Sequence, residues 1–321
     1  MTSDSATQAV PLGTAPTPLE PAPRLAQRLG LRPDDLWIKR DDLFGIGGGG
    51  NKIRKLAHTA AAAIDSSADM LITTGAAQSN HARSTAAVAA RLGMRCTLAL
   101  AGTPPTPASG NLTLDRLFGA RVRWVGDVDE AGLATAAQQL AAEHERAGGR
   151  PYVVPFGGSD AAGAHGYIEC AGEIVAQLPG VVTVVVAVGS GGTMAGLVAW
   201  LDGARVLGVD SGAVPDAGAR VRDLVTALGV ETGPLRLRTD QVGSGYAALT
   251  DAARRAMFDA GTTEGLILEP VYTAKALAGL RAAVEEGDVR PGERTVFLHT
   301  GGLPGLFGHP VAGALAAELL A

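Results

Sequence analysis

The segment Val181–Leu201, VVTVVVAVGSGGTMAGLVAWL, decides the fold class. Its first part, Val181–Val188, is an unbroken apolar run rich in β-branched residues, which predicts a strand that is buried on both faces. A glycine-rich turn then leads into Gly192–Leu201, an apolar stretch long enough for a helix. A doubly buried strand that runs through a tight turn into a helix is typical of a parallel α/β sheet.

The rest of the chain repeats this alternation of short strands and helices. Further strands are expected at 35–40, 70–74, 95–101, 121–125, 151–154, 205–209 and 295–299. Helices are expected at 23–29, 51–63, 79–92, 111–118, 129–146, 161–178 and 214–228. The first 15 residues, rich in Ser, Thr, Pro and Ala, are expected to be loose. We therefore predict an α/β protein with two open, twisted, parallel sheets and a ligand between them, because such sheets bind ligands at the carboxyl ends of their strands.

The composition narrows the class of protein. Of 321 residues, 46% are hydrophobic and 18% are charged, so the chain can bury a large core and is not intrinsically disordered. A net charge of -5 argues against nucleic acid as the main partner. The most apolar run is too short to span a bilayer, and the N-terminus lacks the pattern of a signal peptide. We expect a cytoplasmic protein that binds neither nucleic acid nor membrane.

The two cysteines carry no metal or disulfide signature. Cys96 and Cys170 form no CxxC motif, and each lies in a mostly apolar segment. This pattern predicts buried free thiols in a reducing compartment and no metal site.

A lysine follows a run of glycines in Gly47–Leu56, GGGGNKIRKL. Consecutive glycines before a helix allow the backbone to approach a ligand closely. A phosphate-binding Walker A loop is excluded because Asn51 precedes the lysine and Ile53 follows it. What remains is Lys52 in the first turn of a helix, where the positive end of the dipole lowers the pKa of an amine, as a Schiff-base lysine requires. The alternative is that Lys52 and Lys55 are surface cations beside a flexible loop.

Four polar residues, Gln78–His81, open the helix expected after the strand at 70–74. Ser79 and Asn80 can cap that helix, and its free N–H groups can bind a carboxylate. Ordinary capping is the alternative, although it accounts for one small polar residue rather than four in a row.

The turn Gly189–Thr193, GSGGT, offers a nest of backbone N–H groups to a phosphate. The dinucleotide pattern GxGxxG is absent because residue 194 is Met, so the turn favours a simple phosphate. A tight turn between strand and helix is the alternative. Two further segments, Leu268–Ala276 (LEPVYTAKA) and His299–Phe307 (HTGGLPGLF), are weak signals alone, and a tyrosine such as Tyr272 is often a core residue.

Together these segments resemble a known family. KRDDLFG and GGGGNKIRKL, then GAAQSNHAR, GSGGTMAGL, EPVYTAKA and HTGGLPGLF, stand in the order found in pyridoxal-phosphate enzymes of fold type II, the tryptophan synthase β-like fold. Within that group the chain is similar to D-cysteine desulfhydrases and 1-aminocyclopropane-1-carboxylate (ACC) deaminases. The resemblance extends from about Thr17 to Gly308.

The resemblance implies a role for each matched residue toward pyridoxal 5'-phosphate. Lys52 would form the Schiff base and shuttle the Cα proton, Asn80 would bond the phenolic oxygen, and Thr300 would meet the pyridine nitrogen. The expected phosphate ligands are the amides of Gly189, Ser190, Gly191, Gly192 and Thr193.

The resemblance also implies a substrate site for a small amino acid. Ser79 would take the substrate carboxylate together with the neighbouring Asn80 and His81. Tyr246 and Tyr272 would flank the substrate, and with Lys52 and Ser79 they form the expected catalytic set. A homodimer is expected, with a large cofactor-binding domain at 1–47 plus 163–321, a small domain at 48–162 and the active site in the cleft between them.

Two sequence positions distinguish ACC deaminases from this chain. ACC deaminases carry Glu where this chain has Thr273, and Gln where it has His81. A carboxylate beside the pyridine nitrogen strengthens the electron sink, whereas Thr273 and Thr300 leave that nitrogen with no acidic partner in the matched motifs. We therefore expect β-elimination, with D-cysteine as the first substrate and pyruvate, hydrogen sulfide and ammonia as products. L-cysteate sulfo-lyase, ACC deaminase and a pyridoxal-phosphate-binding protein without turnover are the alternatives.

Overall fold

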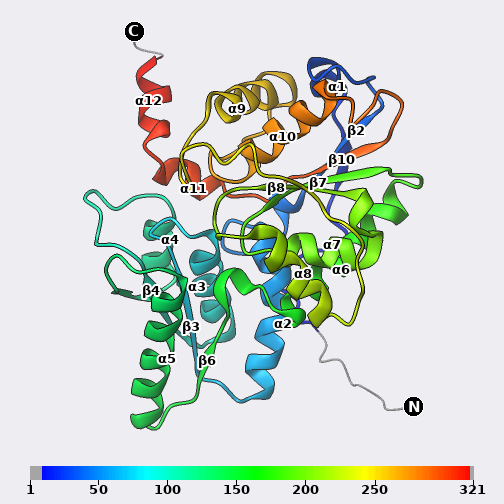
Figure 1. The fold of residues 1–321 in the computed structure, drawn as a ribbon. Helices are drawn as coiled ribbons and strands as arrows, with labels where there is room; N and C mark the ends of the chain where they lie inside the picture. Colours follow the sequence, from blue (N-terminus) through cyan, green and yellow to red (C-terminus); the bar gives the residue numbers. More distant parts are fainter. Residues whose placement is uncertain (1–8, 319–321) are drawn as a thin grey trace, which may run out of the picture.

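The computed structural model describes residues 9–318 and contains two β-sheets, each flanked by helices (Figure 1). The larger sheet has the strand order β1-β2-β10-β7-β8-β9 and the smaller one β5-β4-β3-β6. The predicted α/β class is confirmed.

The larger sheet is mixed rather than purely parallel. Its strands are β1 (Leu19–Pro21), β2 (Leu36–Lys39), β7 (Thr183–Val188), β8 (Val206–Asp210), β9 (Arg236–Arg238) and β10 (Thr295–Leu298). All neighbours run parallel except β1, which is antiparallel to β2 at one edge. The prediction of purely parallel sheets is wrong at this edge, because a three-residue strand that ends in proline shows no alternation to recognise.

Helices cover both faces of the larger sheet. One face packs on α1 (Pro23–Arg28), α9 (Asp251–Glu264) and α10 (Thr273–Glu285), and the other on α6 (Ala161–Gln177), α7 (Gly192–Leu201) and α8 (Ala217–Ala227). Successive residues of β7 alternate between these two cores, with Val185 in the first and Val184 and Val186 in the second. The prediction that this strand is buried on both faces is confirmed.

The smaller sheet is parallel throughout. Its strands are β3 (Met70–Gly75), β4 (Arg95–Leu100), β5 (Arg121–Trp124) and β6 (Pro151–Val153). Helices α2 (Asn51–Asp65) and α3 (Asn80–Leu92) pack in its main core, and α5 (Glu130–Arg146) covers the opposite face. These strands all lie within the range 48–162, and those of the larger sheet lie outside it.

Shorter elements complete the chain. They are α4 (Asn111–Leu117), α11 (Leu303–Gly308), α12 (Val311–Glu318) and the 3-10 turns η1 (Asp41–Leu43), η2 (Phe156–Gly158) and η3 (Gly203–Arg205). The expectation of a loose N-terminus is wrong for residues 9–12, because the Val10 N–H donates to Ala57 O and Leu12 is buried. Residues 13–15 are exposed and belong to no helix or strand, and residues 1–8 lie outside the described residues.

The sequence predicts neither a metal site nor a membrane-spanning segment. Within residues 9–318 there is no cluster of three or more potential metal-ligating side chains, and no helix is long and apolar enough to cross a membrane. Cys96 and Cys170 are free and buried, as predicted.

A buried ionic cluster joins α2 to the larger sheet. Asp41, which is fully buried, accepts hydrogen bonds from Arg54 Nε (2.8 Å), Thr17 Oγ1 (2.8 Å) and Tyr167 Oη (2.8 Å). The Arg54 guanidinium also bonds Glu173 of α6 through Nη1 (2.8 Å). Because each charge is paired and hydrogen-bonded, the cluster offsets its own desolvation and fixes the direction of α2.

We predict that Asp41→Asn destabilises the protein by about 3 kcal/mol, because it leaves the buried Arg54 charge only partly compensated. Denaturant unfolding followed by far-UV circular dichroism measures this change. The matched control is Glu286→Gln, which removes an exposed partner of Arg238 and is expected to leave the midpoint unchanged. Equal effects of the two substitutions would contradict the role assigned to Asp41.

Candidate active site

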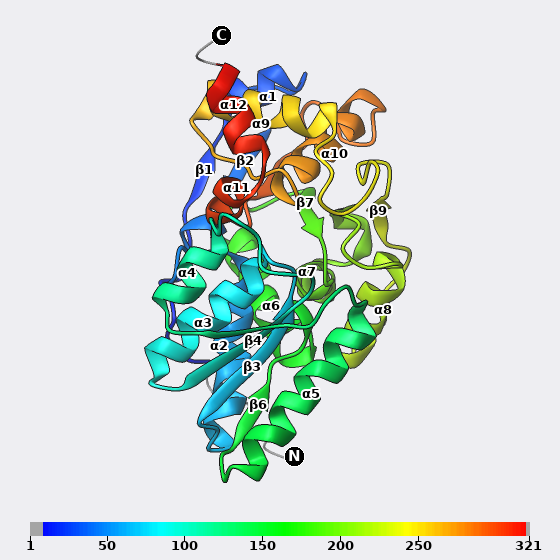
Figure 2. The same ribbon diagram turned by 90° about the vertical axis from the view of Figure 1, so that its left-hand side faces the viewer.

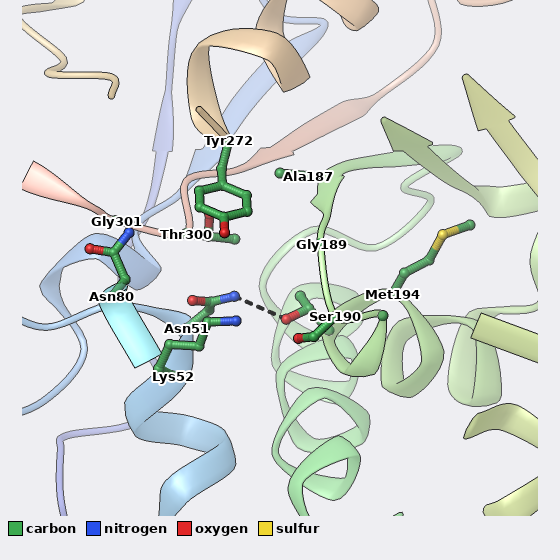
Figure 3. Close-up of a pocket in the computed structure, with 12 residues that line it drawn as sticks. Asn51, Lys52, Asn80, Ala187, Gly189, Ser190, Met194, Tyr272, Thr300 and Gly301 are labelled. Atoms are coloured by element: carbon green, nitrogen blue, oxygen red, sulfur yellow. Dashed lines mark hydrogen bonds between the residues drawn. The ribbon is translucent and has the colours of Figure 1, made fainter. Parts of the chain in front are cut away.

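Two connected cavities lie where the strands of both sheets end. The inner cavity, of about 420 Å³, is lined by Asn51, Lys52, Asn80, Ala187, Gly189, Ser190, Gly191, Thr193, Met194, Tyr272, Thr300 and Gly301. In Figure 3 Lys52 and the segment around Ser190 face each other, with Tyr272 above them. The outer cavity, of about 790 Å³, shares Lys52, Asn80, Ser190 and Tyr272 with it and adds Ser79, His81 and Tyr246.

The start of α2 positions Lys52 in both cavities. The preceding Gly50 has a φ of 111°, and a Cβ there would lie 3.0 Å from Thr300 O, so only glycine fits this close approach. The Asn51 N–H donates to the same carbonyl oxygen (3.0 Å), which ties the helix start to the end of β10. Burial lowers the pKa of Lys52 to about 8, so a useful fraction of its amine is neutral near physiological pH.

Lys55 lies one turn further along α2 and is fully buried, which excludes the alternative that it is a surface cation. Its Nζ donates to Ser159 Oγ (2.6 Å), and that hydroxyl lies 2.7 Å from Ser190 Oγ. Burial and the nearby Lys52 hold the pKa of Lys55 well below its usual value. Two neighbouring buried amines whose charged forms are disfavoured by burial are better satisfied when an anion binds beside them.

The glycine-rich turn before α7 forms the opposite wall of the inner cavity. Gly191 has a φ of 88°, and a Cβ at Gly189 would lie 2.9 Å from the ring of Tyr272. Asn51 Nδ2 donates to Thr193 Oγ1 (3.1 Å), the interaction drawn in Figure 3. Free N–H groups and the positive dipole end of a ten-residue helix suit a phosphate. These residues, with the two amines opposite, fit the cofactor that the sequence implies.

One residue of the expected phosphate loop stands apart from the others. Gly192 does not line either cavity, and its N–H donates to Ser159 Oγ (3.2 Å). Ser159 thus connects the loop to Lys55, and sequence reasoning missed it. The signal was the Gly157-Gly158 pair in η2, which begins three residues after the end of β6, at the edge of the sheet where ligands bind.

The start of α3 carries the expected substrate residues. Ser79 caps the helix, because its Oγ accepts the Ala82 N–H (3.1 Å). Asn80 Oδ1 accepts a hydrogen bond from Asn111 Nδ2 (3.0 Å), which orients the Asn80 side chain. Ser79 therefore acts as the ordinary cap and also lines the outer cavity.

His81 lies in the outer cavity as a neutral acceptor. Thr73 Oγ1 donates to Val154 O (2.9 Å) and lies 2.8 Å from His81 Nε2. With the Thr73 hydroxyl proton assigned to Val154 O, His81 Nε2 carries the ring proton and donates to Thr73 Oγ1, which leaves a lone pair on Nδ1. Nδ1 is buried and has no hydrogen-bond partner within residues 9–318. Burial and the positive charges of Lys52 and Lys55 hold the pKa of His81 well below its usual range.

The two expected tyrosines meet at the boundary of the cavities. Their hydroxyl oxygens lie 2.5 Å apart, and their rings pack edge to face at 5.8 Å. Burial raises the pKa of Tyr246 to about 12 and that of Tyr272 well above its usual value, so both phenols stay protonated. Tyr272 also packs partly against the core while it lines both cavities.

Thr273 lies away from the cavities, whereas Thr300 lines the inner one. The Thr273 hydroxyl accepts the Glu269 N–H (2.9 Å) and is fully buried. Glu269 is an acidic residue of a matched motif that the sequence reasoning overlooked. Its carboxylate is held by the N–H groups of Val271, Tyr272 and Thr273, and among the described residues none that lines the inner cavity is acidic.

The sequence did not anticipate the far wall of the outer cavity. It is formed by Phe156 and Gly157 of η2 and by Asp129, Glu130 and Leu133 around the start of α5. Arg220 of α8 bonds Glu130 at the start of α5 (2.6 Å), and in Figure 2 the upper end of α5 lies next to α8. The larger and smaller sheets therefore both contribute to the site.

The chain matches the model of the pyridoxal-phosphate dependent enzyme family over residues 10–301. It is 41% identical over 315 residues to D-cysteine desulfhydrases of Salmonella choleraesuis (strain SC-B67) and Salmonella typhi, a match that covers 92% of this chain and 94% of each relative. A crystal structure of an ACC deaminase homologue superposes with a TM-score of 0.88 at 36% identity and covers 96% of both chains. Threonine deaminase isoform 2 from Solanum lycopersicum shares the fold. The match has 20% identity and a TM-score of 0.66, and it covers 91% of this chain and 80% of that one. The chain belongs to the family of pyridoxal-phosphate dependent enzymes.

Proposed function

We propose that this enzyme catalyses β-elimination from a small amino acid, with D-cysteine preferred and pyruvate, hydrogen sulfide and ammonia as products. The observation that carries the proposal is the position of Lys52. This lysine has a lowered pKa and lies between the inner cavity, which the Gly189–Thr193 turn helps to line, and a larger outer cavity. The similarity to D-cysteine desulfhydrases supports the choice of substrate.

The residues of the inner cavity divide the task of holding the cofactor. The amides of the Gly189–Thr193 turn would hold the phosphate, Lys55 would offset its charge through Ser159, and Lys52 would hold the cofactor covalently. Asn80 and Thr300 would contact its ring. Bound pyridoxal phosphate withdraws electrons from the Cα of an attached amino acid.

The outer cavity supplies the substrate contacts and the proton transfers. Ser79 and the N–H groups at the start of α3 would bind the carboxylate. Once the substrate amine had replaced Lys52 on the cofactor, the free and neutral Lys52 amine would take the proton from Cα. The Cβ–S bond would then break with its electron pair on sulfur, and the remaining three-carbon enamine would react with one water to give pyruvate and ammonia. The two paired phenols, Tyr246 and Tyr272, share one of their protons in the bond between them and would donate the other to that sulfur, and His81 Nδ1 would accept a hydrogen bond from the substrate.

The absence of an acidic residue from the inner cavity wall, as far as the structure describes it, supports a thiol over a cyclopropane substrate. A thiolate leaves readily once Cα is deprotonated, whereas opening a strained ring needs stronger electron withdrawal. The ACC deaminase homologue of similar structure makes ring opening the second candidate.

We also propose a homodimer, the domain limits 1–47 plus 163–321 and 48–162, and a cytoplasmic location. Large apolar side chains are exposed on neighbouring α4 and α11, with Leu117 73% and Phe307 63% exposed, and such a face suits contact with a second copy. The two free, buried thiols suit a reducing compartment.

We predict that the rate at which cofactor-free protein captures pyridoxal phosphate rises with pH and levels off above about 8, because only the neutral Lys52 amine attacks. The growth of cofactor absorbance measures the rate. Lys52→Ala is expected to bind cofactor only reversibly, with no borohydride labelling and no turnover. A rate in the wild type that is already constant from about pH 6 would contradict the lowered pKa.

We predict opposite effects of Lys55→Met on cofactor affinity and on apo-protein stability. The dissociation constant of pyridoxal phosphate should rise at least about tenfold because a cation beside the phosphate is lost. The cofactor-free protein should become more stable, on the order of 1 kcal/mol, because a poorly compensated buried amine is removed. Lys39→Met is the matched control, since Lys39 is equally buried but paired with Glu173, and it should lower stability without changing cofactor affinity. If Lys55→Met bound pyridoxal phosphate with unchanged affinity, the phosphate would not lie beside Lys55.

We predict that the wild type releases pyruvate from D-cysteine faster than 2-oxobutyrate from ACC at equal concentration. A panel with L-cysteine, L-cysteate and β-chloro-D-alanine, scored by keto-acid release, tests the leaving group and the handedness together. Thr273→Glu should impair β-elimination, because the new carboxylate enters the buried turn that Glu269 occupies. Faster turnover of ACC than of D-cysteine by the wild type would overturn the proposed order.

A further inference from the structure

The side chain of Lys275 is fully buried and ends among four backbone carbonyl groups. Its Nζ donates to Ser211 O (3.1 Å), Val242 O (3.0 Å), Gly245 O (3.1 Å) and Tyr246 O (3.0 Å). These oxygens come from two separate loops. The nearby carboxylates of Asp210 and Glu269 favour the charge of the ammonium group, but its hydrogen bonds go to the carbonyl oxygens. We call this set of four carbonyl groups the carbonyl cage.

The loop that contains Tyr246 is held by a small number of contacts, which include a hydrogen bond from His309 Nε2 to Ala247 O (3.1 Å) and the packing of Leu249 against the core. Residues 239–250 between β9 and α9 form turns and irregular backbone, with Gly243 and Ser244 exposed. The side chain of Tyr246 is held by the Tyr272 hydroxyl, and its carbonyl is held by Lys275. Tyr272 and Lys275 stand one turn apart at the start of α10, so one helix end fixes Tyr246 at two points.

The second loop lies against the cofactor side of the site. Ser211 donates its N–H (2.9 Å) and its Oγ (2.8 Å) to Val188 O, the last residue of β7 before the phosphate-binding turn. Ala213, two residues further on, lines the outer cavity. Lys275 therefore links the end of β7, the Ala213 wall and the Tyr246 loop.

A general-base role for Lys275 does not fit this geometry. An ammonium group has three protons, and here they are shared among four acceptors, so the protonated form is fully satisfied. A cage of carbonyl oxygens is also the environment that replaces the hydration shell of a potassium ion. The ammonium thus acts as a tethered monovalent cation.

We propose that Lys275 is a positioning residue, a built-in monovalent cation whose ammonium group holds the Tyr246 loop over the substrate cavity. The effect on turnover rests on the proposed function, because it acts through Tyr246. The cage itself does not, since it requires neither cofactor nor substrate.

Lys275→Met tests the proposal, because it keeps the apolar stem and removes only the cation. The variant is compared in chlorides of potassium, ammonium, sodium and choline at equal ionic strength. In choline we expect kcat/KM for D-cysteine to fall at least about tenfold, since small misplacements of a site residue have effects of that size. Potassium or ammonium should recover most of the loss, sodium less, and the wild type should not respond to the cation.

Thermal unfolding of the cofactor-free variant gives a readout without catalysis. We expect potassium to raise the melting temperature of Lys275→Met, relative to choline, by at least about 3 °C, and to leave the wild type unchanged. Lys39→Met removes an equally buried ammonium that bonds Thr17 O, Glu173 and Gln177, and its activity should not depend on the cation. If Lys275→Met does not fold, Lys275→Gln, which keeps two N–H donors, takes its place.

A double substitution tests whether Lys275 acts through Tyr246. If it does, Lys275→Met combined with Tyr246→Phe should lose less activity than the two single effects multiplied. Full activity of Lys275→Met in choline, or an equal loss in every salt without a potassium-specific change in melting temperature, would overturn the proposal. A wild type that turns over no amino acid would reject the proposed function, whereas the potassium-specific stabilisation would still support the cage.

Discussion

The placement of helix α2 by the buried Asp41 carboxylate is the constraint on which the site depends. Arg54, which Asp41 and Glu173 hold, lies two residues from Lys52 and one from Lys55 on the same helix. Because a helix is stiff over a few turns, fixing Arg54 against the larger sheet also fixes where the two amines point. Since α2 packs on α3 as well, the same cluster sets how the start of α3 faces the larger sheet.

The second feature that organises the site is a group of buried lysine and histidine side chains whose protonated forms are disfavoured by burial. Lys52, Lys55 and His81 each have a pKa below the usual value, with burial as the largest cause. Burying these groups destabilises the protein while no anion is bound, and this cost is offset once a phosphate and a carboxylate bind. Because burial disfavours the protonated forms, Lys52 has a neutral, nucleophilic amine and His81 can accept a hydrogen bond. Cofactor capture and substrate recognition therefore share one physical cause.

The substrate side of the site is built from irregular backbone that other groups must hold. The Tyr246 loop is fixed by the Tyr272 hydroxyl and by the Lys275 ammonium, and the α5 start is fixed by the bridge from Arg220 to Glu130. Side chains in loops that are held by a few polar contacts can be substituted without disturbing the packing of either hydrophobic core. Differences in substrate among members of this fold are therefore most easily made here.

The sequence alone determined the α/β class, nearly all of the longer elements before residue 230, and the residues that meet around the inner cavity. These features are local: an apolar run such as that of β7 or a glycine run before a helix carries its own signal. Only the tertiary structure decided the rest. The edge strand β1, the cage around Lys275, the hydroxyl of Ser159 beneath the phosphate turn and the tautomer of His81 depend on partners distant in sequence. Their physical basis is burial and hydrogen bonding between segments that only the fold brings together, and no local pattern encodes them.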